Sequence, residues 1–224
     1  MGVYIEAFID NNLYEKDLFY TVEKLAKLLN KKIYVYNLAK EYPPSDENDL
    51  LLIQFYYNEE FDEGTYEEHI KNTTYLQISV YDKNFEFCDI SMSKSSIQFY
   101  GFGWKWHVFE SYLKGETDMF DDKLKEIKHY GKLFNSTELI VFADDYYEKE
   151  IEDKLLEGEY IKDIIKNDEF NIVSEIPIND ENYPHIYYIK YENDNSNFDL
   201  TEWVSHFPII KNEEYLAPFN KDKE

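Results

Sequence analysis

Apolar and polar positions in the first part of the chain follow two different periods. Residues 3–9 alternate with a period of two, which predicts a β-strand. Residues 15–30 repeat apolar side chains at helical spacing, which predicts an amphipathic α-helix. The apolar face of that helix consists of Leu18, Val22, Leu25 and Leu29. A second strand is predicted at residues 33–36, and a loop at residues 41–48, where two adjacent prolines disfavour regular structure.

Four further β-strands are predicted between residues 50 and 102 from short runs of strand-forming residues. The runs span residues 50–57, 74–81, 85–92 and 97–102. The acidic segment 58–68 separates the first two runs. The first half of the chain is therefore expected to form a strand, a helix and a strand, followed by an antiparallel meander.

The second half is expected to alternate helices and strands. Helices are predicted at residues 104–113, 118–134, 146–156 and 160–166, and Gly158 marks the end of the third. Strands are predicted at residues 139–142, 170–176 and 186–191. The first of these strands is wholly apolar, as expected for a strand that is covered on both faces.

Together these patterns predict an α+β protein of the mixed α/β kind. We expect one domain over residues 1–224. The alternative is a boundary near residues 101–103, which would divide the chain into subdomains 1–102 and 103–224.

The charge of the chain restricts its partners more than its motifs do. The 224 residues include 23 lysines and no arginine against 47 Asp and Glu, for a formal net charge of -24. Such a surface repels nucleic acid and anionic membranes and attracts basic proteins and cations. A biased coding background accounts for the missing arginine, since Lys, Asn, Ile and Tyr are all abundant. Because 18% of the residues are aromatic, the acidity does not indicate disorder.

The N-terminus and the single cysteine agree with a cytoplasmic protein. Residues 1–6 lack the basic and apolar regions of a signal peptide, and no apolar run is long enough to span a membrane. Cys88 cannot form an internal disulfide, and its strand-like surroundings indicate a half-buried structural thiol.

Asp144 and Asp145 are the first candidate site residues, because they follow the predicted buried strand. The carboxyl ends of strands often carry functional groups, and two carboxylates there could bind a divalent cation. The simpler interpretation, which we favour, is that one of them caps the next helix, with Glu148 adding favourable charge in its first turn.

The other candidates are aromatic. Trp104 and Trp106 lie in a glycine-bounded segment beside His107, and Tyr146 and Tyr147 follow the aspartate pair. Tryptophan and tyrosine are enriched at protein-binding hot spots. The two tryptophans could equally belong to the core. Adjacent tyrosines cannot both point inward on a regular element, so some tyrosines are expected to lie on the surface among carboxylates.

No residue pattern identifies an enzyme or a cofactor site. The five histidines do not form a zinc signature, and His107 with Glu110 or Glu202 with His206 is more consistent with surface contacts. The chain lacks a Walker loop, a dinucleotide-binding glycine fingerprint and a nucleophile elbow. We therefore expect no catalytic residue, no resident metal and no cofactor.

The acidic chain without catalytic motifs resembles the immunity proteins of bacterial polymorphic-toxin systems. Locally the resemblance rests on the strand-to-helix segment 138–145 and on residues 156–159. It implies a basic protein partner, a toxin or nuclease, that is bound through charge complementarity. The alternatives are a phage-type nucleic-acid mimic that blocks a defence complex, and a metal-dependent enzyme that uses Asp144 or Asp145. The oligomeric state does not follow from the sequence.

Overall fold

The structure of the chain is a computed structural model. It describes residues 5–29, 31–35, 50–54, 66–82, 85–86, 90–99, 111, 119–143, 149–167, 172–173 and 186–193. The described strands are β1 (Ile5–Asp10), β2 (Lys32–Val35), β3 (Leu50–Gln54), β4 (Tyr75–Asp82), β5 (Phe85–Glu86), β6 (Ile90–Ser93), β7 (Ser96–Phe99), β8 (Glu138–Ala143), β9 (Ile172–Val173) and β10 (Ile186–Lys190). The described helices are α1 (Leu18–Leu29), α3 (Tyr66–Asn72), α5 (Met119–Leu133), α6 (Lys149–Glu157) and α7 (Ile161–Ile164).

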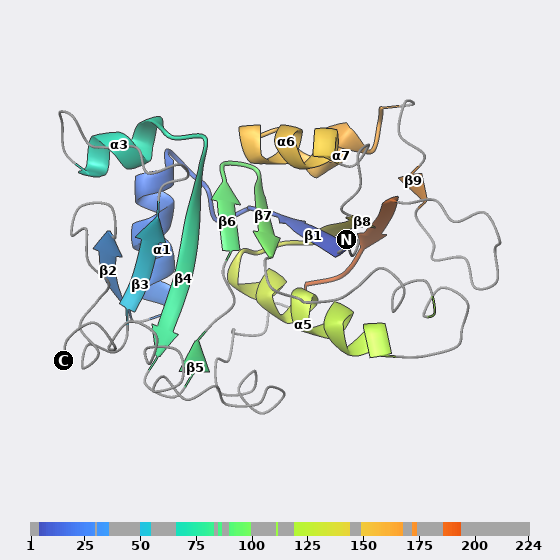
Figure 1. The fold of residues 1–224 in the computed structure, drawn as a ribbon, viewed down its shortest axis with the longest axis horizontal. Coiled ribbons are helices and arrows are strands. Elements are labelled where there is room, and N and C mark those ends of the chain that lie inside the picture. The colour runs from blue at the N-terminus through green and yellow to red at the C-terminus, as the bar shows by residue number, and fades with distance from the viewer. Residues whose placement is uncertain are drawn as a thin grey trace, which may run out of the picture.

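All described strands belong to one mixed sheet (Figure 1). Its order is β2-β3-β4-β6-β7-β1-β8-β10-β9, with β5 paired to β4 outside this path. The pairs at the two edges, β2 with β3 and β9 with β10, are parallel, and the remaining pairs are antiparallel. Strands β3, β4, β6 and β7 form the predicted antiparallel meander. The first strand of the chain, β1, lies between β7 and β8.

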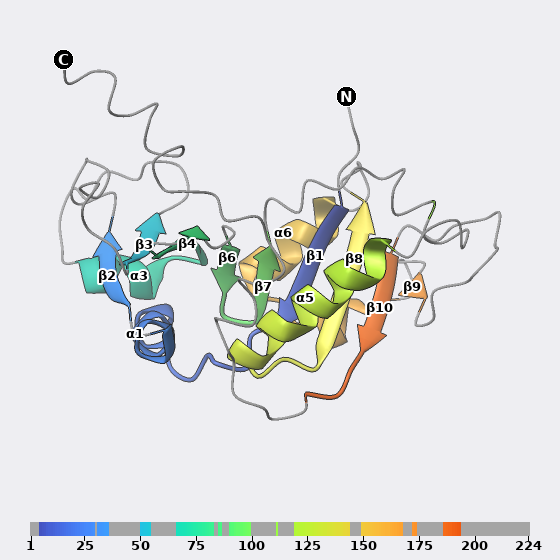
Figure 2. The same cartoon turned by 90° about the horizontal axis from the view of Figure 1, so that it is seen from below.

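Different helices cover the two faces of the sheet. Helices α1 and α5 lie on one face and α6 on the other (Figure 2). Strand β8 shows the division residue by residue, because Leu139 and Val141 join the buried cluster under α1 and α5. Ile140 and Phe142 join the cluster under α6 and α7. This confirms that the apolar run at 139–142 is a strand covered on both faces.

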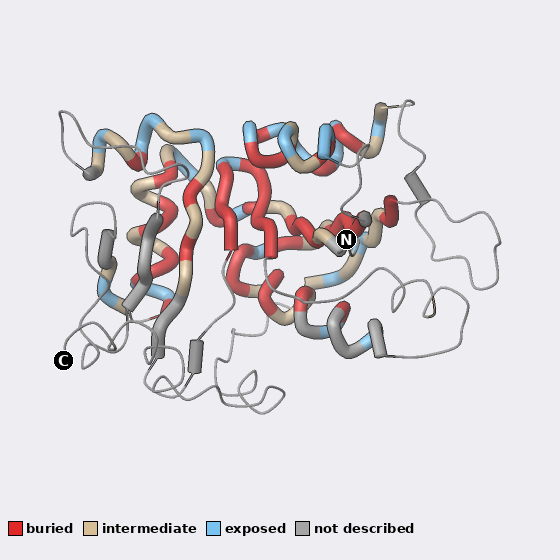
Figure 3. Tube along the Cα trace, viewed as in Figure 1, coloured by how far each residue is buried: buried red, intermediate tan, exposed pale blue. Residues whose placement is uncertain are grey.

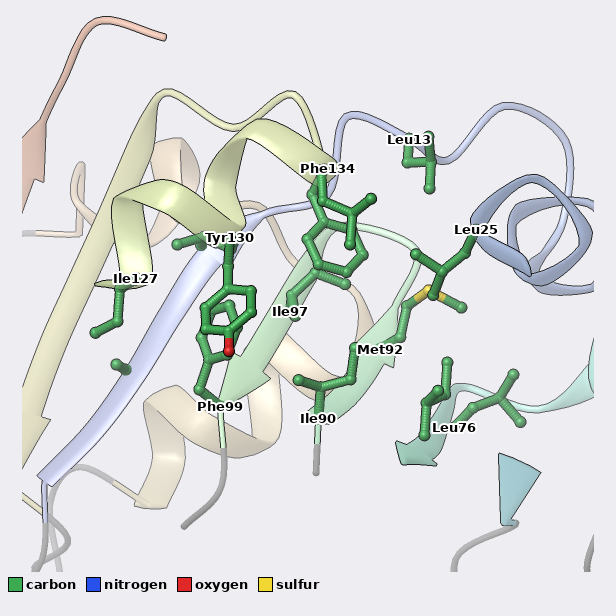
Figure 4. Close-up of a cluster of buried hydrophobic side chains, with 14 of the residues drawn as sticks. Leu13, Leu25, Leu76, Ile90, Met92, Ile97, Phe99, Ile127, Tyr130 and Phe134 are labelled. Atoms are coloured by element: carbon green, nitrogen blue, oxygen red, sulfur yellow. The ribbon is translucent and has the colours of Figure 1, made fainter. Parts of the chain in front are cut away.

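The larger cluster holds α1 and α5 against the sheet. Figure 4 shows Leu25 of α1 beside Met92 and Leu76, and Tyr130 of α5 over Phe99. The ring centroids of Phe99 and Tyr130 are 5.4 Å apart. A fully buried Leu, Ile, Met or Phe side chain contributes about 1.5–3 kcal/mol to the free energy of folding. Among the residues that the structure describes, buried positions gather on the central strands, most clearly on β6 and β7 (Figure 3).

The α+β class is confirmed, and the structure adds one helix that the local patterns did not predict. Residues 66–72, of which the first three belong to the acidic segment 58–68, form helix α3, and Ile70 of this helix is fully buried in the cluster that contains α1. Glu67 and Lys71 form an ion pair one turn apart on this helix. Of the strand predicted at 85–92, residues 85–86 form β5 and residues 90–92 belong to β6, and residues 87–89 lie outside the described residues. Of the described helices, none has the length and apolar character needed to cross a membrane.

Candidate functional site

The six residues predicted to bind a partner, Trp104, Trp106, Asp144, Asp145, Tyr146 and Tyr147, all lie outside the described residues. The short helix predicted at 104–113 and the thiol Cys88 lie outside them as well. What the structure does establish is where the two segments that carry these residues are attached. The first segment follows Phe99 at the end of β7, and the second follows Ala143 at the end of β8.

Both attachment points lie at the same end of the central strands. Phe99 pairs with Ala7 of β1, and Ala143 pairs with Ile5 of the same strand. Because β1 separates β7 from β8 and the two end residues are offset by two positions along β1, the two segments start about 12 Å apart. Residues that are about forty positions apart in the sequence therefore belong to segments with neighbouring origins. We call this end of β7, β1 and β8 the central strand end.

Acidic residues are distributed unevenly between the described elements and the rest of the chain. The described residues contain 20 Asp and Glu and 16 Lys, so they are close to neutral. The remaining residues contain 27 Asp and Glu and only 7 Lys. On the described surface several lysines are paired with acids, for example Lys154 with Glu150 and Lys166 with Asp163. Most of the net negative charge of the chain thus lies on residues outside the described ranges.

A polar group lies beneath α6, near the central strand end. The amide nitrogen of Gln98 donates to the carboxylate of Glu6 at 2.9 Å and to that of Glu152 at 2.8 Å. Glu6 belongs to β1, Gln98 to β7 and Glu152 to α6. Gln98 is completely buried, although Glu6 and Glu152 are only partly buried. One amide therefore brings two carboxylates together at the edge of the core.

Two buried oxygen atoms in this group have no hydrogen-bond partner. They are Oε1 of Gln98 and Oγ of Ser91. Ser91 is also completely buried, and it pairs directly with Gln98 in the β6–β7 ladder. Residues directly opposite each other in an antiparallel pair project on the same face of the sheet. A buried acceptor without a donor costs about 1–3 kcal/mol, so such atoms indicate either strain or a ligand.

The turn between β6 and β7 fixes the position of α6 above this group. The hydroxyls of Ser93 and Ser96 each donate to the carbonyl oxygen of Leu155 at 2.9 Å. The hydroxyl of Ser95 donates to the carbonyl oxygen of Glu159 at 2.6 Å. Glu152 precedes Leu155 by three residues and so lies on the same side of the helix. Serines that satisfy the end of α6 thereby direct Glu152 toward the sheet.

A second polar cluster lies at the opposite end of the same strands. Oδ1 of Asp10 accepts hydrogen bonds from the backbone N–H groups of Thr137 at 3.0 Å and Glu138 at 2.9 Å, and from the hydroxyl of Ser136. The hydroxyl of Tyr191 donates to Oγ of Ser136 at 2.8 Å. Because the Asp10 carboxylate is occupied by donors from one turn, this cluster joins the end of β1 to the turn between α5 and β8 and has the character of a structural contact.

Neither cluster provides a recognisable catalytic constellation. Within the described ranges, no three His, Cys, Asp or Glu side chains are arranged to hold a metal ion. The cation-binding interpretation of Asp144 and Asp145 concerns residues outside those ranges and stays a prediction. Comparisons with protein-family models, with curated proteins and with solved structures found no match for this chain.

Proposed function

We propose that this protein is a stoichiometric inhibitor of a basic effector protein, as its resemblance to immunity proteins of polymorphic-toxin systems implies. In this proposal the segments attached at the central strand end cover the active site of a toxin or nuclease. Trp104, Trp106, Tyr146 and Tyr147 supply contact area, and Asp144 and Asp145 supply charge. A cytoplasmic location belongs to the same proposal, because an immunity protein acts where its toxin would act.

The net charge of -24 over 224 residues is the observation that carries this proposal. So large an excess of acids does not stabilise the fold, because like charges repel in the compact state. It does raise the rate at which a basic partner is captured, by about 10–1,000-fold at low salt. The net charge therefore supports electrostatic steering of a basic partner.

The shared origin of the candidate segments supports the location of the surface. Protein interfaces depend on a few aromatic anchors near their centre, surrounded by polar residues. Two aromatic and acidic segments that start on either side of β1 can contribute to one such surface. The described strands β7, β1 and β8 would then hold the starts of these two segments in place.

The test uses the full chain and two variants that lose the same charge. Asp144→Asn/Asp145→Asn alters the proposed surface, whereas Asp153→Asn/Glu157→Gln alters two exposed acids of α6. Each protein is immobilised on a resin and incubated with an extract of the native host. Basic proteins that are retained are identified and purified. The activity of each purified protein is then measured with and without the unaltered chain. We expect one partner, bound one-to-one and inhibited by the unaltered chain. We expect its association rate to fall at least fivefold in the first variant and less than twofold in the second.

Two results would contradict the proposal. One is the absence of any basic protein that binds with a defined stoichiometry when both components are purified. The other is an equal loss of binding in both variants, which would indicate unspecific attraction to net charge. If duplex DNA competes for a captured DNA-binding complex, the nucleic-acid mimic would replace the toxin inhibitor as the explanation.

A further inference from the structure

We propose that Glu6, Gln98, Glu152 and Ser91 form an oxygen-lined site for a hard divalent cation, such as Ca²⁺ or Mg²⁺, between the sheet and α6. The proposed site uses none of the six residues predicted to bind a partner, and it does not depend on the proposed inhibitor function. Its residues come from β1, β6, β7 and α6, so an ion bound there would link three strands to the helix that covers them.

The carboxylates of Glu6 and Glu152 are held near each other by one shared hydrogen-bond donor. Their oxygens are 2.9 and 2.8 Å from the same amide nitrogen. Protein oxygens bind Ca²⁺ at about 2.3–2.6 Å and Mg²⁺ at about 2.0–2.1 Å, so ligands on opposite sides of either ion are about 4–5 Å apart. Two oxygens at hydrogen-bonding distance from one nitrogen can reach this separation without movement of the backbone.

The amide of Gln98 can change from donor to ligand by a local rotation. The last torsion of a glutamine side chain has a broad, roughly two-fold energy profile. Half a turn about this bond exchanges Nε2 with Oε1 and directs the oxygen toward both carboxylates. This oxygen is buried and has no hydrogen-bond partner. The same rotation would therefore satisfy Oε1 and complete a set of two carboxylates and one amide oxygen.

Ser91 supplies an independent indication of a ligand. Its hydroxyl oxygen is buried without a hydrogen-bond partner, and the residue lies directly opposite Gln98 on the same face of the sheet. Carboxylate, amide and hydroxyl oxygens are hard ligands, which Ca²⁺ and Mg²⁺ prefer. Because Ser91 and Gln98 both have 0% exposure, a small ion fits this position better than a lysine side chain of a partner protein.

The experiment is a calorimetric titration of the full chain with CaCl2, and separately with MgCl2. The protein is first treated with a chelator and exchanged into about 0.15 M KCl, which screens diffuse attraction of cations to the acidic surface. Glu6→Gln/Glu152→Gln removes the two carboxylates of the site. Asp153→Asn/Glu157→Gln removes two exposed acids, one of them beside Glu152 on α6, and serves as the matched control.

We expect one ion per chain, with a dissociation constant at least about tenfold larger in the site variant and nearly unchanged in the control. A second variant, Gln98→Glu, adds a third carboxylate, and we expect it to bind the ion about tenfold more tightly and to be stabilised by it. Absence of one-to-one binding would overturn the proposal. So would equal weakening in both double variants, or a Gln98→Glu protein that divalent ions neither bind nor stabilise.

Discussion

The hydroxyl of Tyr191 fills the space in which a side chain on Gly131 would lie. A Cβ atom on Gly131 would contact the hydroxyl oxygen and would lie 3.1 Å from Cζ of the same ring. Gly131 is near the end of α5, where glycine is otherwise unfavourable in a helix. The glycine lets the tyrosine cross the helix and reach Ser136, so α5, β8 and the segment after β10 meet at one point.

We therefore expect Gly131→Ala to destabilise the protein, although alanine favours helix. Replacing glycine by alanine inside a helix stabilises the helix by about 1 kcal/mol. Overpacking at a buried position destabilises the protein by about 1–3 kcal/mol. Chemical denaturation should show a net loss of about 1 kcal/mol in the free energy of unfolding. Tyr191→Phe removes the contacting oxygen, so the double variant should lose less than the sum of the single variants. Additive losses would show that the two residues do not interact.

Gly158 ends α6 with a φ of 100°, in the region that favours glycine. Its N–H donates to the carbonyl oxygen of Leu155 at 3.2 Å, and the N–H of Glu159 donates to that of Lys154 at 2.8 Å. A Cβ atom here would also lie 2.8 Å from Cγ of Lys94. We expect Gly158→Ala to cost about 1–2 kcal/mol in urea unfolding. Adding Lys94→Ala should recover only the part that is due to crowding, because the backbone strain persists. Full recovery would argue against strain.

The serines beneath α6 should differ in their contributions. Ser93 donates to Leu155 and also accepts from the backbone N–H groups of Ser95 and Ser96. Ser96 shares the same Leu155 carbonyl, which keeps one donor when Ser96 is removed. Ser93→Ala should therefore cost about 2–3 kcal/mol, and Ser96→Ala about 1 kcal/mol or less. Hydrogen exchange should show faster opening of the last turn of α6 in Ser93→Ala. Equal effects would contradict this hydrogen-bond arrangement.

Local patterns were sufficient to predict most elements, because each has a clear period. The helix from Leu18 and the strand at 139–142 follow directly from the spacing of apolar residues, and the stop at Gly158 follows from glycine chemistry. Helix α3 was missed because Ile70 is the single aliphatic residue among its seven, too few to show a period. Its helical state depends on packing against α1, which the local sequence does not contain.

The polar group under α6 could not be predicted for a different reason. Gln98 is 92 residues from Glu6 and 54 residues from Glu152, so only the order of the strands brings them together. The sequence does contain a signal: Gln98 lies between Ile97 and Phe99 in a strand whose four residues are all buried. A buried glutamine must find partners, and this requirement marks a polar contact without naming its other members.

Tyr188 should make the stability of the protein depend on pH in alkaline solution. Burial, and secondly its hydrogen bond to Glu138 at 3.1 Å, raise the pKa of Tyr188 from 10.0 to about 12. Below pH 10 the phenol is neutral in both states, so its contribution is fully present. Between pH 10 and pH 12 the unfolded chain releases this proton while the folded chain retains it, and unfolding becomes more favourable.

We expect the urea midpoint to fall as the pH rises from 9 toward 11, with a smaller fall in Tyr188→Phe. The lysines also lose charge in this range, so the informative quantity is the difference between the two proteins at each pH. Phenylalanine preserves the ring and removes the titrating group, which isolates the phenol. Parallel curves would mean that Tyr188 has the same pKa in both states and that its contact with Glu138 does not hold the proton. A stability advantage over Tyr188→Phe that narrows only above pH 10 would identify Tyr188 as a source of the alkaline instability, because the contribution of the neutral phenol is lost there.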